Sequence, residues 1–276
     1  MRSVERVAVM THGRAERIGP ALERLEALAA RLGIELLYAP EELDKHGRED
    51  GDGPLEHADL AVVLGGDGTT LRALNRFLGT DVAVIGVNFG RVGFLSSIQD
   101  DELERGLERA FAGDYTVIEL NTLTCEIGGA ERSAVNDVVA HSSTVGRMVQ
   151  ISWSVAGEDL GELACDGVVC CTPAGSTAYN LSAGGPVLVW GIEALAVTFV
   201  APHSLQARPL VVPRGQDVTV RNLTPDVRLA VTLDGHVFEE LGTGGELRLR
   251  LDDRRARLAT LPERTFFRRF RDTFAP

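Results

Sequence analysis

Lysine is almost absent from this chain of 276 residues: Lys45 is the only one, and every other Lys/Arg position is arginine. A Walker A loop requires a Gly-Lys-Ser/Thr step, whereas Lys45 stands in Asp-Lys-His, so the sequence excludes P-loop nucleotide chemistry. Schiff-base catalysis is restricted to the same position. Any phosphate group must therefore be bound by backbone amides, arginines or a metal ion.

Long apolar runs and a basic excess are missing as well. No uninterrupted stretch of about 18 apolar residues exists, so no membrane span is expected. The apolar part of the first twelve residues is too short and too strand-like for a secretory signal. The 28 basic and 40 acidic residues give a net charge of −12, which disfavours a nucleic-acid-binding protein. We expect a cytoplasmic protein with no nucleic-acid or membrane partner.

Cysteine is scarce, and its spacing argues against a metal site. Cys125, Cys165, Cys170 and Cys171 form no Cys-x-x-Cys pair and lie in apolar surroundings. This pattern is typical of reduced thiols in a hydrophobic core rather than of a disulfide framework. We therefore assign no metal-binding residues.

The first 115 residues alternate between strand and helix patterns. We expect strands at 4–10, 34–39, 58–64 and 81–87, helices at 15–32, 70–78 and 101–111, and a charged surface loop at 40–57. This alternation predicts a Rossmann-like α/β domain with a parallel sheet over residues 1–115.

The remainder of the chain has a different sequence pattern. Val-, Thr- and Leu-rich segments separated by Gly, Pro, Asn and Asp predict a β-rich domain over 116–255, with a short helix near 176–183. In the tail, 256–276, Phe267, Phe270 and Phe274 recur at helical spacing with arginines between them. We expect this Phe stripe to pack on the protein; the alternative is a basic amphipathic helix on a membrane surface.

A glycine-rich loop follows the third predicted strand. Gly65, Gly66 and Gly68 allow backbone N–H groups to approach an anion, and the helix after Thr69 adds the positive end of its dipole. Asp67 is unfavourable for simple anion binding, so it is either a general base or a ligand of phosphate-bound Mg²⁺. The alternative is a tight turn in which Asp67 or Thr69 caps the helix.

Three further segments carry polar or glycine-rich sequence. Segment 86–95 (GVNFGRVGFL) leaves another predicted strand and suits either a flat ligand or a plain loop. Asn136 and Asp137 interrupt an apolar run and need partners in the protein or on a ligand, unless they form a hairpin turn. Segment 165–186 gathers hydroxyl and amide side chains that suit ribose and base edges.

GGDGT, GVNFGRVGFL, Asn-Asp and, above all, DGVVCCTPAGSTAYNLSAGGP together resemble the NAD kinase family. The resemblance covers residues 58–236, including PHSLQARPLVV at 202–212 and Leu-Asp-Gly at 233–235. GGDG alone also occurs in diacylglycerol and sphingosine kinases, with a related motif in phosphofructokinases, whereas STAY combined with SAGGP is close to diagnostic. The family phosphorylates the 2′-hydroxyl of the adenosine ribose of NAD. Its fold is an α/β domain plus a β-rich domain with the site between them, and its chain end returns to the first domain.

The resemblance implies roles for individual residues. Asp67 corresponds to the family's catalytic aspartate, Gly68 lines the same site, and Arg72 matches a basic position facing the nucleotide. The other positions matching NAD contacts are Asn136, Asp137, Arg147, Asp166, Thr177, Ala178, Tyr179, Asn180, Leu181, Ser182 and His236.

Three positions depart from the family's usual residues. Ala174 replaces a frequent Thr, Ala164 a basic residue, and His236 a Gln or Asn, although His236 can still hydrogen-bond a substrate. The resemblance further implies Mg²⁺ or another divalent cation bound with the donor phosphates, ATP or polyphosphate as donor, NAD or NADH as acceptor, and a homodimer or homotetramer.

Two other functions stay open from the sequence alone. A lipid kinase of the diacylglycerol or sphingosine type would share the phosphate loop but would line its cleft with apolar side chains. A non-catalytic NAD-sensing module would have no need of Asp67, which is present here.

Overall fold

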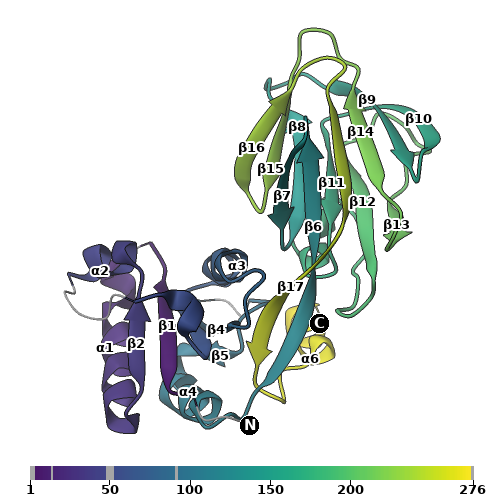
Figure 1. Ribbon diagram of the computed structural model, residues 1–276. Helices are drawn as coiled ribbons and strands as arrows, with labels where there is room; N and C mark the ends of the chain where they lie inside the picture. The colour runs from purple at the N-terminus through teal and green to yellow at the C-terminus, as the bar shows by residue number, and fades with distance from the viewer. Residues whose placement is uncertain (1–3, 14, 48–52, 91–92, 275–276) are drawn as a thin grey trace. The chain divides into compact units, whose positions relative to one another are not determined.

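The structure is a computed structural model that describes residues 4–13, 15–47, 53–90 and 93–274. It divides into two compact units (Figure 1). Unit 1 comprises Met1–Glu119 and Ala256–Pro276, and unit 2 comprises Leu120–Arg255. The expected fold class is confirmed, because unit 1 is an α/β unit that includes the chain end and unit 2 is β-rich.

Unit 1 is built on a parallel sheet. Its strands lie in the order β2 (Glu35–Tyr38), β1 (Arg6–Thr11), β3 (Leu60–Leu64) and β4 (Ala83–Asn88), with β5 (Ile98–Gln99) beside β4. The end of β17 (Glu246–Thr260) also runs parallel to β4, where Leu258 lies opposite Val84. All residues of β3 and β4 are buried, as is typical of parallel strands covered on both faces.

Helices cover this sheet. α1 (Ala15–Leu32) and α4 (Leu103–Phe111) share a hydrophobic core with alternate residues of β1, β3 and β4, while α3 (Asp67–Arg76) packs on β3 and β4. A 3₁₀ turn, η2 (Asp100–Glu102), precedes α4. Among the described residues, no helix is both long and apolar enough to cross a membrane.

The expectation of a surface loop at 40–57 is wrong for its described part. This part contains the helix α2 (Pro40–His46) and the 3₁₀ turn η1 (Leu55–His57). Pro40 stands at the start of α2, and Gly47 ends it with a left-handed φ of 60°. The Pro and Gly residues that suggested a loop are therefore the boundaries of a short helix. Residues 48–52 lie outside the described part.

The last helix, α6 (Phe266–Phe274), buries a different face from the one expected. Phe266 and Arg269 are buried, whereas Phe267 is 69% exposed, Phe270 40% and Phe274 39%. The prediction counted arginine as a surface residue, so it placed the buried face one position away from the observed one.

Unit 2 is an antiparallel β-sandwich. One sheet has the order β13 (Leu210–Pro213), β12 (Ala194–Val200), β11 (Gly167–Cys171), β8 (Asp137–Ser142), β15 (Leu229–Leu233) and β16 (His236–Leu241). The other contains β10 (Glu158–Cys165), β9 (Val149–Val155), β14 (Val218–Asn222), β17, β6 (Thr116–Ile127) and β7 (Ala130–Ala134). The core between the sheets includes Cys125, Cys165 and Cys170. Burial raises the pKa of Cys125 to about 12, as expected for an inert core thiol.

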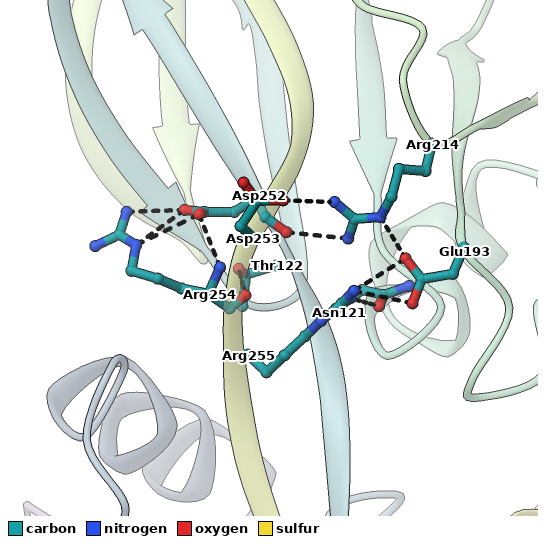
Figure 2. A network of polar contacts seen from close by, with 8 residues as sticks. All are labelled: Asn121, Thr122, Glu193, Arg214, Asp252, Asp253, Arg254 and Arg255. Atoms are coloured by element: carbon teal, nitrogen blue, oxygen red, sulfur yellow. Dashed lines mark hydrogen bonds and ion pairs between the residues drawn. The ribbon is translucent and has the colours of Figure 1, made fainter.

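A polar network ties the segments of unit 2 where β6 enters it and β17 leaves it (Figure 2). Arg214 and Arg255 both bind the carboxylate of Glu193, and Arg255 also donates to Asn121. Thr122 donates from Oγ1 to the carbonyl of Arg254 at 2.8 Å. These contacts hold β6 and β17 near their midpoints, where the chain passes from one unit to the other.

Candidate active site

Asp67 is the first residue of α3, and its carboxylate reaches another loop. The N-cap is Gly66, and no side chain caps the helix. Asp67 instead accepts the backbone N–H groups of Phe94 (to Oδ2, 2.5 Å) and Leu95 (to Oδ1, 3.1 Å). The capping interpretation is therefore wrong, and the first two glycine-rich motifs meet at this carboxylate.

Glycines allow this close approach. A Cβ on Gly93 would lie 2.0 Å from Asp67 Oδ1, and a Cβ on Gly65 would lie 2.6 Å from Thr69 Oγ1. Neither distance is possible between real atoms, so any larger residue would displace the loop or the side chain. Residues 91–92 of the second motif lie outside the described residues.

Two glycines at the N-terminus of α3 have space beside them. No described atom lies within 4 Å of a Cβ built on Gly66 or Gly68, and Gly68 is exposed. The first N–H groups of a helix and the positive end of its dipole attract anions. An exposed glycine thus follows Asp67 at the end of α3 that carries these N–H groups.

Two basic side chains converge at the carboxyl end of β1. Arg72 donates to the carbonyl of Thr11 at 2.8 Å, and Lys45 donates to the same oxygen at 3.2 Å. Lys45 also binds the buried carboxylate of Glu42 at 2.7 Å. Ligands of parallel sheets bind at this edge. The sequence analysis placed Lys45 and Glu42 in a loop and so did not include them among the site residues. Pro40 and Gly47, which bound α2, would have indicated a helix here.

In unit 2, Asp234 holds the backbone of the Asn-Asp pair. Its carboxylate accepts the N–H groups of Val135 (2.8 Å), Asn136 (2.8 Å) and Asp137 (3.1 Å). This segment links β7 to β8, which belong to different sheets, so the hairpin alternative is wrong. The sequence analysis named Asp234 only as part of the Leu-Asp-Gly motif and assigned no role to its carboxylate.

The side chains of this pair differ in surroundings. The Asp137 carboxyl is 7% exposed, and burial, followed by the negative charge of Asp234, raises the pKa of Asp137 to about 7. Asn136 Oδ1 is buried and has no hydrogen-bond partner among the described residues. A buried acceptor of this kind requires a donor from water or a ligand.

Segment 165–186 lies directly against this pair. Thr172 donates from Oγ1 to the carbonyl of Val135 at 2.7 Å and from its N–H to the carbonyl of Asn136 at 2.9 Å. A Cβ on Gly175 would lie 2.1 Å from the backbone carbonyl oxygen of Asn136. The structure therefore brings the Asn-Asp pair and segment 165–186 together.

Within this segment the predicted contact residues are not equivalent. Asn180 is fully buried, and its side chain binds the carbonyls of Ser176 and Pro186 and the hydroxyl of Thr198. It therefore holds the loop between η3 (Gly175–Thr177) and β12. The others, at the start of α5 (Tyr179–Ser182) and just before it, are half-buried or exposed: Thr177, Ala178, Tyr179, Leu181 and Ser182.

Arg147 and Asp166 lie away from the Asn-Asp pair. Asp137 begins β8, whereas Arg147 follows its far end, and the carbonyl of Asp166 accepts the N–H of Ser142 at that same end. Six strand residues span roughly 17 Å. Asp166 also links β10 to β11 in different sheets, so it is not a hairpin turn. His236 is exposed at the start of β16.

Comparison with known proteins identifies the family. Residues 52–115 match the family model of the ATP-NAD kinase N-terminal domain, and residues 135–261 match that of the C-terminal domain. The NAD kinase of Gemmatimonas aurantiaca is 38% identical over 274 residues, covering 96% of this chain and 94% of that protein. The chain belongs to the NAD kinase family. The protein is therefore an enzyme, a kinase that acts on NAD and forms NADP, and the two alternative functions are wrong.

Further relatives agree with this assignment. The NAD kinase of Heliobacterium modesticaldum is 39% identical over 223 residues, covering 79% of both chains. The crystal structure of an NAD kinase from Archaeoglobus fulgidus in complex with ATP superposes with a TM-score of 0.77 at 26% identity, covering 97% of this chain and 99% of that one. The yeast NADH kinase complexed with NADH has a TM-score of 0.86 at 22% identity, covering 100% and 89%, and shows the same fold.

Proposed function

We propose that this NAD kinase transfers the γ-phosphate of ATP to the 2′-hydroxyl of the adenosine ribose of NAD, with Asp67 as the general base. The observation that carries the proposal is the position of the Asp67 carboxylate, which two backbone amides fix beside the N-terminus of α3. The ATP complex of the Archaeoglobus fulgidus relative supports ATP as donor. Polyphosphate presents the same chain of phosphates and is the alternative donor.

The donor phosphates bind at the loop of unit 1. Backbone N–H groups of Gly66 and Gly68 and the dipole of α3 supply the donors. The N–H of Gly65 is bonded to the carbonyl of Val87 and that of Thr69 to the carbonyl of Gly66, so Gly65 and Thr69 shape the loop. Arg72 of α3, whose guanidinium binds the carbonyl at the end of β1, adds positive charge near this edge. Phosphoryl transfer depends mainly on such positioning and charge neutralisation.

A divalent cation fits this loop when it arrives with the donor. Among the described residues, no group of three or more His, Cys, Asp or Glu side chains could hold a metal ion. Mg²⁺ is commonly bound by substrate phosphates together with one or two carboxylates, so the donor phosphates would supply most of its ligands. A bond from the Asp67 carboxylate to the cation is the alternative to the role of Asp67 as base. When bound, the cation would neutralise phosphate charge.

Asp67 acts by orientation. Each of its oxygens accepts one backbone N–H, which leaves lone pairs for a substrate hydroxyl. The carboxylate takes the 2′-hydroxyl proton as the ribose oxygen attacks the γ-phosphorus, while the bond from this phosphorus to the β,γ-bridging oxygen breaks and ADP leaves. Because the transition state is loose, this proton leaves late, and the fixed direction of the carboxylate matters more than its basicity.

Unit 2 binds the nucleoside. Asn136 Oδ1 accepts a hydrogen bond from an amino group or hydroxyl of NAD, and Asp137 lies next to it. The exposed ring of Tyr179 offers a stacking surface, while Asn180 holds the loop. Thr177, Ala178, Leu181 and Ser182 line the same surface. Arg147, Asp166 and His236 are proposed as further NAD contacts, and a homodimer or homotetramer as the assembly.

One assay tests the proposal. Purified protein is incubated with ATP, Mg²⁺ and NAD, and NADP is measured with a dehydrogenase that accepts only the 2′-phosphorylated dinucleotide. Parallel reactions contain NADH, polyphosphate or excess EDTA. We expect NADP to form with ATP and not to form in excess EDTA. NADP formation that is unaffected by EDTA would contradict the requirement for a divalent cation. The absence of NADP with ATP would contradict ATP as the donor.

A further inference from the structure

Arg269 is a buried arginine close to the proposed base. It lies on α6 and is 2% exposed, and its neighbour Arg268 on the same helix is exposed. Burial lowers the pKa of Arg269 to about 10, and the negative charge of Asp67 opposes this lowering. The guanidinium therefore stays charged at neutral pH inside unit 1.

The guanidinium binds the segment that seats Asp67. Nη1 donates to the carbonyls of Phe94 (2.8 Å) and Ser96 (2.5 Å), and Nη2 donates to Ser97 Oγ (2.9 Å). Two further donors reach Thr260 Oγ1 (2.7 Å) and the carbonyl of Arg264 (3.1 Å). One planar group thus fixes several atoms of segment 94–97.

The same segment faces Asp67 with its other atoms. Phe94 gives its N–H to Asp67 and its carbonyl to Arg269, and the Ser96 hydroxyl lies 3.4 Å from Asp67 Oδ1. A negative and a positive side chain therefore hold opposite sides of one stretch of backbone. The Phe94 carbonyl and the Leu95 N–H belong to one planar peptide unit, so a shift of that carbonyl would also move the Leu95 N–H.

Aromatic contacts reinforce the same link. The Phe94 ring lies 5.4 Å from the Phe266 ring, edge to face, and 6.1 Å from the Phe274 ring. α6 therefore holds Phe94 through its ring as well as through its carbonyl. Arginine is required because lysine has three donors on one atom and cannot span these acceptors.

We propose that Arg269 is a positioning residue for the kinase reaction: through the carbonyls of Phe94 and Ser96 it directs the amides that orient the Asp67 carboxylate. This inference rests on the proposed role of Asp67 as the base. It gives the end of the chain a part in catalysis, although Arg269 itself touches no reacting atom.

The test compares two arginines of one helix. Arg269→Ala should lower kcat about 10- to 100-fold and leave the KM for NAD within about twofold, because orientation is lost and the nucleoside contacts remain. Arg268→Ala should stay within about twofold of wild type. Added guanidinium at concentrations below those that unfold the protein should restore part of kcat in Arg269→Ala, and Arg269→Lys should remain impaired. If Arg269→Ala does not fold, Arg269→Gln takes its place with the same expected and contradicting results.

A double variant separates this inference from the proposed base. In an Asp67→Asn background, adding Arg269→Ala should change kcat less than twofold, since Arg269 acts through Asp67. If Asp67→Asn is impaired but Arg269→Ala has the kcat of Arg268→Ala, the inference is wrong and the base assignment stands. Losses that multiply in the double variant would also overturn it. If Asp67→Asn retains wild-type kcat, the base assignment itself fails.

Discussion

The carboxylate of Asp67 accepts the backbone N–H of Phe94 at 2.5 Å, although 27 positions separate the two residues. This bond joins two glycine-rich motifs that the sequence shows only as separate loops. It fixes the direction of a carboxylate at the start of α3, where phosphate oxygens are attracted. A carboxylate held in this way is suited to proton transfer in a site that otherwise favours anions.

Gly93 should be indispensable for the position of the Asp67 carboxylate. In Gly93→Ala the added methyl group would collide with Asp67 Oδ1, so we expect kcat to fall at least tenfold while the protein stays folded. Gly90→Ala is the matched control, because its Cβ would meet only Asn88 Oδ1, at 4.0 Å. Steady-state kinetics and circular dichroism of both variants check this; equal kcat values would show that the Asp67 seat is not required.

Asp234 should support NAD binding through the backbone of the Asn-Asp pair. Asp234→Asn replaces the charged acceptor of three N–H groups, and we expect weaker NAD binding and a loss of about 1.5–3 kcal/mol in unfolding free energy. Asp226→Asn is the control, since Asp226 also has a left-handed φ (59°) but is exposed. Calorimetry and urea unfolding measure both effects. Asp234→Asn behaving like Asp226→Asn would remove Asp234 from the site.

Asp137 should make stability depend on pH. Its pKa is about 7 in the folded protein and near 4 in the unfolded chain, so the folded state binds more protons between these values. The resulting stabilisation is fully present below about pH 4 and is lost as the pH rises through 7. Asp137→Asn lacks this loss, so its stability relative to wild type should increase from pH 5 to pH 8 by on the order of a few kcal/mol. Urea unfolding at four pH values tests this, and a constant difference would contradict it.

The fold class was readable from the sequence because the change from strand–helix alternation to β-rich texture near residue 115 reflects two different packing modes. The helix α2 was missed because Pro and Gly, which bound it at Pro40 and Gly47, occur in loops as well as at helix ends. The role of Arg269 was not visible, because its partners include the carbonyl of Phe94, 175 positions away, and the hydroxyl of Thr260, 9 positions away. Hydrophobic periodicity carries no information about such contacts.

The site was only partly readable for the same reason. Glycine spacing pointed to the loop of Asp67, and the polar run at 165–186 pointed to a ligand surface. The sequence did not show that Asn180 is fully buried or that Asp234 binds three N–H groups. Both facts depend on contacts between distant segments.

Asp67→Asn tests the central claim most directly. Asparagine is nearly the same size and keeps one acceptor oxygen for the amides, but it cannot take a proton. If Asp67 is the general base, kcat should fall by about 10²–10⁴, with little change in NAD affinity. If Asp67 instead ligates Mg²⁺, the loss should shrink as Mg²⁺ is raised and the KM for the donor should increase. Steady-state kinetics at two Mg²⁺ concentrations distinguishes the two, and a kcat within about threefold of wild type would contradict the general-base assignment.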